Sequence, residues 1–166
     1  MRVLPHLILL FFVVATTCGS KHVSAESADG ESKEASNIKR IYPTGRGFSQ
    51  VVIATGQRHI FISGQVAIDG NGNLVGKGDL AAQTEQVLKN IEVWLRVSGA
   101  TFDDLVRMTI YVVDYDPEKR EVMQRVRDRF IPADQGPAST LVGVSKLALD
   151  GLLVEIEAQA VIGSDG

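Results

Sequence analysis

The acidic side chains of the stretch 152–160 are the residues of this sequence best suited to chemistry. Side chains alternate along a strand, so Glu155, Glu157 and Gln159 would share one face and the apolar residues between them the other. A carboxylate held on a sheet face can orient or deprotonate a water molecule. The same alternation is typical of a half-buried strand that simply turns polar residues to water, so the pattern alone leaves both interpretations open.

The sequence lacks the residues that thiol or metal chemistry would need. Cys18 is the only cysteine and lies near the N-terminus, so the folded part of the chain has neither an internal disulfide nor a thiol nucleophile. The histidines are His6, His22 and His59, and no cluster of histidine, cysteine and carboxylate residues has the spacing of metal ligands. We therefore expect no metal centre.

Strands that would position these residues can be placed from periodicity. Apolar and β-branched residues predict strands at 51–55, 59–67, 106–113, 137–142 and 152–160. The first two flank a turn at Gly56-Gln57, which predicts a hairpin.

Two amphipathic helices are predicted between the strands. The first has Asp79 as its N-cap, carries Trp94 in its apolar stripe and ends at Gly99. The second begins at Pro117. Its arginines are expected on a solvated face, and they are Arg120, Arg125, Arg127 and Arg129.

The resulting order is strand, strand, helix, strand, helix, strand, strand, and it predicts an α+β fold in which one sheet carries two helices on one face. Two helices cover only one side of such a sheet. The uncovered side would carry the apolar residues Phe61, Tyr111, Val113 and Leu141. An exposed apolar face of this kind predicts burial against further copies of the chain in a closed assembly.

Composition limits the number of domains and the classes of partner. With 166 residues, 45 % of them hydrophobic, and a formal net charge of −3, the chain fits one globular domain with a tail. Its 17 basic side chains form no run, so we expect neither a nucleic acid nor an anionic membrane as a partner.

The N-terminal segment predicts export. Residues 7–15 are apolar but too few to span a bilayer, and small residues follow where a signal peptidase would cut, so residues 1–25 are expected to be a removed signal leading to the periplasm or to secretion. Lipidation of Cys18, which would make a lipoprotein, is the alternative. Residues 26–40 lack periodicity and are expected to form a disordered tether. The domain would then span residues 41–163.

Several motifs of the domain agree in order and spacing with one known family. They are Ser63-Gly64-Gln65, Gly78-Asp79, Gln83-Thr84, Pro137-Ala138-Ser139-Thr140 and Val154-Glu155-Ile156-Glu157-Ala158. From about Gly47 to Val161 the chain resembles the Rid family, also called YjgF or endoribonuclease L-PSP. The resemblance implies a chorismate-mutase-like α+β fold and a homotrimer with ligand clefts between subunits. In the best-known branch it implies hydrolysis of reactive 2-imino acids to 2-oxo acids and ammonia, without a metal or an organic cofactor.

The resemblance also assigns site residues, two of which depart from the family pattern. Glu155 matches the glutamate that positions the attacking water, and Gly64 and Leu141 match positions whose backbone groups touch the ligand. Ser139 stands where the imine-hydrolysing branch has an arginine that clamps the substrate carboxylate. Phe48 stands where that branch has a tyrosine.

The missing arginine changes the ligand that we expect. A guanidinium clamp on a carboxylate contributes about 1.5–3 kcal/mol, so its loss would weaken binding of a 2-imino acid by about ten- to several-hundred-fold. We therefore expect a ligand that is neutral or anchored elsewhere. Arg107, on a neighbouring strand, is a candidate replacement if its face and reach allow.

Two functions follow as expectations. The first is hydrolytic deamination of an imine, enamine or related C=N compound, with Glu155 positioning water and Ser139 donating to the ligand. The alternative is a homotrimer that binds a small molecule without turnover. A ribonuclease, the older family label, would need a basic groove or stacking aromatic residues, and the sequence shows neither.

Overall fold

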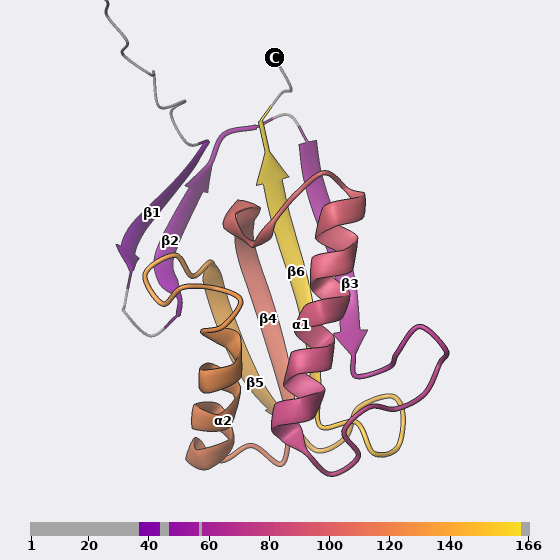
Figure 1. The fold of residues 1–166 in the computed structure, drawn as a ribbon. Helices are drawn as coiled ribbons and strands as arrows, with labels where there is room; N and C mark the ends of the chain where they lie inside the picture. The colour runs from indigo at the N-terminus through magenta and orange to yellow at the C-terminus, as the bar shows by residue number, and fades with distance from the viewer. Residues whose placement is uncertain (1–36, 44–46, 57, 164–166) are drawn as a thin grey trace, which may run out of the picture. The chain divides into compact units, whose positions relative to one another are not determined.

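The computed structural model describes residues 37–43, 47–56 and 58–163, which form a single sheet with two helices against one of its faces (Figure 1). The strands are β1 (Ile38–Pro43), β2 (Ser49–Ala54), β3 (Arg58–Val66), β4 (Leu105–Val113), β5 (Ala138–Val144) and β6 (Val154–Ile162). The helices are α1 (Leu80–Val97), α2 (Pro117–Arg127) and the short 3₁₀ turn η1 (Phe102–Asp104). The export signal expected at 1–25 lies outside the described residues, as does most of the expected tether.

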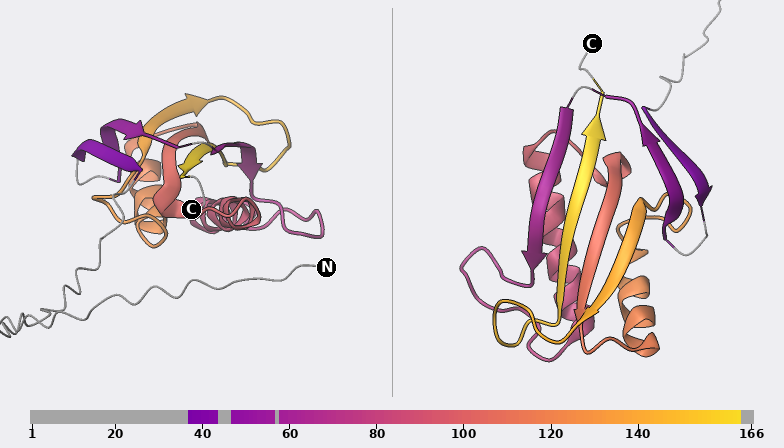
Figure 2. Two further views of the ribbon diagram at one scale, coloured as in Figure 1. Left: turned by 90° about the horizontal axis from the view of Figure 1, so that it is seen from above. Right: turned by 180° about the vertical axis from the view of Figure 1, so that it is seen from behind.

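The strands lie in the order β1-β2-β5-β4-β6-β3. β4 is parallel to β5 and antiparallel to β6, and β6 is antiparallel to the edge strand β3. Both helices lie on the same side, and no helix of the described residues lies over the other face of the sheet (Figure 2). The predicted α+β architecture is confirmed.

Side-chain caps define where the two helices begin. The carboxylate of Asp79 accepts a hydrogen bond from the backbone N–H of Ala82 at 3.1 Å, which satisfies a donor in the first turn of α1. Gly99 follows the end of α1 with φ +75°, a conformation that favours glycine. Asp116 caps α2 in the same way through Lys119, and Pro117 occupies the first turn, as predicted.

The core lies between the helices and the sheet. Its fully buried side chains include Val87, Leu88, Ile91 and Leu95 of α1 and Met108, Val112, Val154 and Ile156 of β4 and β6. Trp94 was expected in the same stripe but is 50 % exposed. Its indole N–H donates to Gln65 Oε1 at 3.0 Å, so the ring lies at the border of the core and fastens α1 to the end of β3.

The predicted hairpin between the first two strands is wrong. β2 pairs with β1 and with the start of β5, whereas β3 pairs with β6 on the other side of the sheet (Figure 1). The chain passes close over the end of β6 at Gly56, where an added Cβ would overlap the carbonyl oxygen of Ile162. Gly56 therefore lies where the chain passes from one side of the sheet to the other. A turn-forming residue in the sequence does not distinguish such a crossing from the tight turn of a hairpin.

β1 was not predicted, and it shortens the expected tether. Ile38, Lys39 and Arg40 pair with Ala54, Ile53 and Val52 of β2. Ile38 is buried, which gives this edge strand an anchor.

The face assigned to Leu141 is also wrong. In the parallel β4–β5 ladder Leu141 pairs with Ile110, which belongs to the core, so both residues face the helices. Val142 pairs with Tyr111 and lies on the uncovered face, where Leu141 was expected.

Among the described residues, no helix is long and apolar enough to cross a membrane.

Candidate functional site

Glu155 lies on the uncovered face of the sheet, next to Gly64. It lies between two buried residues that face the helices, Val154 and Ile156, so the pleat directs its side chain the other way. Its cross-strand neighbours are Tyr111 on β4 and Val66 on β3. A Cβ added at Gly64 would overlap Glu155 Oε1, so the carboxylate packs directly on the α-carbon of the glycine.

The ladder between β3 and β6 is irregular at this point. Its register shifts between Ile62 and Gln65, and this irregularity includes Gly64. Glu155 is half-buried, and within the described part of the chain its side chain makes no hydrogen bond or ion pair. Its carboxylate oxygens are therefore available to a water molecule or a ligand. Gly64 and Glu155 are thus two expected site residues that the structure brings together.

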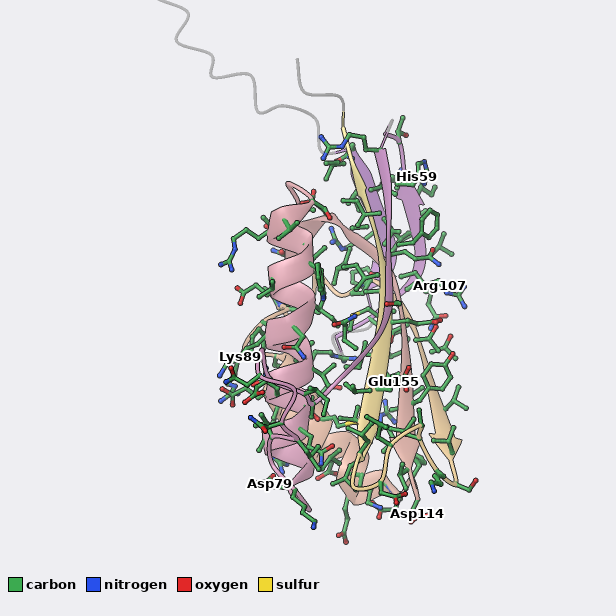
Figure 3. The ribbon with its side chains drawn as sticks, turned by 90° about the vertical axis from the view of Figure 1, so that its right-hand side faces the viewer. His59, Asp79, Lys89, Arg107, Asp114 and Glu155 are labelled. Carbon is green, nitrogen blue, oxygen red and sulfur yellow. The ribbon has the colours of Figure 1, made fainter. Side chains whose placement is uncertain are left out.

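Further toward the end of the sheet, the same face has a shallow hollow of about 320 Å³. Arg107 and Glu157 line it, and Phe61 beside them is 74 % exposed. Figure 3 shows Arg107 on the side of the sheet away from α1. Phe61, Val142 and Tyr111 give this face the apolar character expected of a surface that another chain covers.

Ser139 lies on the opposite face. It pairs with buried Met108 in the β4–β5 ladder and lines a cavity of about 300 Å³ beneath α2. The other lining residues are Phe48, Thr84, Leu88, Ile110, Tyr115, Arg120, Met123, Gln124, Arg127, Leu141, Gly143 and Ile156. Three expected site residues, Ser139, Leu141 and Phe48, therefore share this cavity.

Phe48 reaches the cavity because the segment before β2 is fastened to the loop before β5. The backbone N–H of Gly47 donates to the carbonyl of Ala133 at 3.1 Å, and the hydroxyl of Ser49 donates to the carbonyl of Gly136 at 2.8 Å. Ser49 is itself buried. These bonds close one wall of the cavity with residues that are distant in the sequence.

Arg127 is the main residue of this cavity that the sequence analysis assigned wrongly. It was expected on a solvated face, but it is only 9 % exposed. Its Nη2 donates to Gln124 Oε1 at 3.2 Å, and a Cβ at Gly47 would overlap the same nitrogen. Burial lowers the pKa of Arg127, nearby Arg120 lowers it further, and Asp128 opposes both effects. The burial of Arg127 could have been predicted from the spacing of residues, because Arg127 follows buried Met123 by four residues and so lies on the same face of the helix.

The sheet separates Glu155 from Ser139 within one chain. Glu155 faces the uncovered side and Ser139 faces the cavity beneath α2, so the two cannot hold the same ligand unless a second copy supplies one of them. Arg107 is separated from Ser139 in the same way and does not replace the missing guanidinium in that cavity. Among the described residues no group of three or more His, Cys, Asp or Glu side chains could hold a metal ion.

Comparison with protein families gives a match over nearly the whole described domain. The sequence model described as endoribonuclease L-PSP matches residues 37–162. A RutC family protein of Aquifex aeolicus is 33 % identical over 129 residues, which are 78 % of this chain and 98 % of that protein. Protein DfrA of Myxococcus xanthus is 35 % identical over 114 residues, covering 69 % of this chain and 84 % of that protein.

Solved structures give the same result. A protein of unknown function from Yersinia pestis, described as YyfB of the conserved Rid protein family, is 41 % identical with a TM-score of 0.71, over 76 % of this chain and 99 % of that one. A putative endoribonuclease from Thermotoga maritima is 29 % identical with a TM-score of 0.58, over 76 % of this chain and 99 % of that one.

Proposed function

The chain belongs to the endoribonuclease L-PSP family, together with its Rid and RutC relatives, and on that premise we propose that it hydrolyses an imine, enamine or related C=N compound to a carbonyl compound and ammonia. The contact between Glu155 and Gly64 carries this proposal. It leaves a carboxylate with available oxygens on a sheet face, at the position of the family's water-positioning glutamate.

Glu155 would act as the general base for water. Its carboxylate accepts a proton from the water as the oxygen bonds to the carbon of the C=N group, and the π electron pair moves to nitrogen, which takes up a proton. The resulting carbinolamine collapses to C=O, and the C–N bond breaks as ammonia leaves after protonation. One water is consumed for each ammonia released, and no oxidant or reductant is needed.

The site also requires a second copy of the chain. Glu155 lies on a face that no described helix covers, and the exposed Phe61 lies on the same face, opposite Gln159 of the strand that carries Glu155. A neighbouring copy would exclude bulk water and strengthen the electrostatic interactions of the carboxylate. We therefore propose the homotrimer that the family resemblance implies, with the reaction in a cleft between copies.

Binding without turnover is the second candidate, and the cavity beneath α2 favours it. Ser139 and two arginines line that cavity, but no carboxylate of the described residues does, so a ligand could be held there without one of these acids to activate water. In this case the family's hydrolytic activity would have been lost together with the arginine at position 139.

Export remains a proposal that depends on residues 1–25. Mass spectrometry of protein purified from its native host should show a mature chain that begins near Glu26. A diacylglyceryl adduct on Cys18 would replace this proposal with the lipoprotein alternative.

The test of the catalytic proposal is release of ammonia from freshly generated imines, measured with the full chain and two glutamate variants. Glu155→Gln keeps the shape of the side chain but removes its charge, and we expect ammonia release to fall by about 100-fold or more. Glu157→Gln is the matched control, because Glu157 lies on the same strand and face but pairs with Thr109, away from Gly64. It should retain activity within about threefold.

Two results would change the conclusion. Equal activity of the wild type and Glu155→Gln would remove Glu155 from the mechanism. If the wild type releases no ammonia from any imine, yet a small molecule raises its unfolding temperature, the binding function replaces the enzymatic one.

A further inference from the structure

The loop that connects β3 to α1 (Figure 1) contains an asparagine followed by a glycine, Asn71-Gly72, and the chemistry proposed at Glu155 does not use it. Asparagine is a thermolabile residue, because its side-chain amide can react with the backbone nitrogen of the residue that follows. We propose that Asn71 is a site of spontaneous covalent modification, at which the chain loses ammonia and an aspartate or an isoaspartate takes the place of the asparagine.

The reaction needs no partner other than water. The backbone nitrogen of Gly72 bonds to the side-chain carbonyl carbon of Asn71, the bond from that carbon to Nδ2 breaks, and Nδ2 leaves as ammonia with the proton of the backbone nitrogen. The resulting succinimide takes up one water molecule, which opens the ring at either of its two carbonyl carbons. One opening gives aspartate and the other gives isoaspartate, and neither step needs an oxidant or a reductant.

The surroundings of Asn71 leave its side chain available for this reaction. Asn71 is exposed, and within the described residues its side-chain amide makes no hydrogen bond. Gly72 has φ +85°, and a Cβ built on it would meet nothing within 4 Å. Because a glycine has no side chain to obstruct the approach, the attacking nitrogen is accessible to the amide of Asn71.

The other three asparagines of the sequence have bonded amides and bulky successors. Asn37 and Asn90 donate through Nδ2 to backbone carbonyls at 3.1 Å and 2.9 Å, and an isoleucine follows each of them. Asn73 donates through Nδ2 to Asp69 Oδ2 at 3.4 Å, and the half-buried Leu74 follows it. One asparagine of the four therefore combines an unbonded amide with a following glycine.

Asp69 is also followed by a glycine, but its carboxylate is held as a hydrogen-bond acceptor. Its Oδ1 accepts from the backbone N–H groups of Asn71 and Asn73, both at 2.9 Å. The N–H of Asn73, and after it that of Asn71, lowers the pKa of Asp69, so this group stays ionised at neutral pH. A negatively charged carboxylate is a poorer target for a nitrogen nucleophile than a neutral amide, which again favours Asn71.

The hydrogen bonds of Asp69 also set the rate of the reaction. The backbone N–H of Gly72 donates to the carbonyl of Asp69 at 3.0 Å. The nitrogen can attack only after it has given up this proton, so the turn must open first. The rate should therefore rise when Asp69 loses the carboxylate that helps to hold the turn closed.

This site goes beyond the function proposed above and does not depend on it. Modification of Asn71 releases no more than one ammonia per chain, whereas hydrolysis of an imine releases ammonia in proportion to the substrate added. The two sources are therefore distinguished by stoichiometry, and failure of either proposal leaves the other intact.

The experiment is peptide mapping by mass spectrometry after the full chain has been incubated at mildly alkaline pH. We expect modification at Asn71 before any other asparagine and before isomerisation of Asp69. Asp69→Ala should raise the rate at Asn71 by about three- to tenfold, the factor expected when a turn loses a hydrogen bond that holds it closed. Lys77→Ala is the matched control and should leave the rate unchanged, because Lys77 is an exposed residue of the same loop that makes none of these bonds.

Two further measurements guard against a variant that fails to fold. Asp69→Ala should keep a cooperative urea transition, which excludes global unfolding as the cause of its faster reaction. In the wild type, the modified chain gains a negative charge and separates by anion exchange, and the ammonia released should match the fraction separated.

The proposal would be overturned by a first modification at Asn37, Asn73 or Asn90, or by isomerisation of Asp69 before any change at Asn71. It would equally be overturned by an intact Asn71 after the denatured chain has reacted there completely, or by equal rates in the wild type and Asp69→Ala.

Discussion

Glu155 depends on its small neighbour for its place on the sheet. The carboxylate packs on the α-carbon of Gly64, where any side chain would overlap Oε1. The atoms that a new methyl group would meet belong to the flexible end of Glu155, so the glutamate can move aside without disturbing the backbone. A substitution at Gly64 should therefore change the position of the Glu155 carboxylate with little effect on the stability of the fold.

We predict that Gly64→Ala lowers the rate of ammonia release by about tenfold or more and the free energy of unfolding by no more than about 1 kcal/mol. Both are measured on the same preparation, by the ammonia assay and by urea unfolding.

A double-mutant cycle with Glu155→Gln shows whether the effect passes through the carboxylate. Gly64→Ala should cost little further activity in the Glu155→Gln background. Equal losses in both backgrounds would mean that Gly64 acts independently of Glu155.

Part of this site could be predicted at the level of single residues. Strand alternation alone placed Glu155 on the face opposite the core, and the resemblance assigned Gly64 to the ligand site without indicating that the two residues are in contact. Leu141 was misplaced because its face was assigned without knowing which residue of the neighbouring strand it pairs with. The sequences of β4 and β5 do not by themselves determine the register between the two strands. Arg127 was missed because a charged residue was assigned to solvent by its type rather than by its helix face.

At the scale of elements, Gln83 connects α1 to the loop that follows β3 and to the loop that precedes β6, which lie at the same end of these two strands. Its Nε2 donates to the carbonyls of Gly76 and Gly151, and its Oε1 accepts from the N–H of Leu153, two residues before Glu155. The side chain is fully buried. α1 thus holds the start of β6 through one amide group.

We predict that Gln83→Leu lowers the free energy of unfolding by about 2–4 kcal/mol, because it leaves two carbonyls and one N–H without this partner in a buried place. Urea unfolding measures the change. Gln86→Leu, on the same helix, removes only a bond to Asn90 and should cost less than about 1 kcal/mol. Equal costs for both variants would contradict the role given to Gln83.

The two helices are also connected through Glu85. Hydrogen bonds from Lys89 and Arg129 lower the pKa of Glu85 from its ordinary 4.5 to about 2. Arg129 Nη2 lies 2.5 Å from the carboxylate and Lys89 Nζ 2.8 Å. Because the pKa is lower in the folded state, Glu85 stabilises the fold above about pH 4.5, and this contribution is lost as the pH falls toward 2.

We predict that Glu85→Gln lowers the urea midpoint at pH 6 and has a smaller effect at pH 3, since the wild type has by then lost part of the same contribution. Salt should reduce the difference at pH 6, because these side chains are largely exposed. Glu92→Gln, an exposed residue of the same helix, is the control. A difference between wild type and Glu85→Gln that does not change with pH would contradict this account.

Elements were easier to predict than their pairing. Both helices carry capping residues and an apolar stripe, which are local signals, so their starts at Asp79 and Pro117 were correct. The partners of β2 and β3 were wrong because β3 pairs with the distant β6, and β2 pairs with the distant β5 and with β1, which was not predicted. Alternation within a strand does not identify its partners.

At the scale of the whole molecule, the uncovered sheet face is the surface through which we propose that copies of the chain associate. Phe61, on the edge strand β3, is 74 % exposed on this face and lines the same hollow as Arg107 and Glu157. On the helix side, Val97 is 72 % exposed, which makes it an apolar residue of nearly equal exposure outside the proposed interface.

We predict that the protein sediments as a trimer and that Phe61→Glu shifts it to the monomer at micromolar concentration, because a charge would be buried without a partner at the interface. Val97→Glu should remain a trimer. Sedimentation velocity distinguishes these species. A monomeric wild type, or a trimer that withstands Phe61→Glu but not Val97→Glu, would place the interface elsewhere.

The claim on which the proposed chemistry most depends is that a second copy of the chain completes the site around Glu155. Its direct test is the rate of ammonia release per chain, measured across concentrations that span dissociation of the trimer, for the wild type and for Phe61→Glu. The rate should follow the fraction of trimer and fall to background in the monomeric variant, although Glu155 is intact in it. Undiminished activity in a monomer, or none in a trimeric wild type, would contradict the claim.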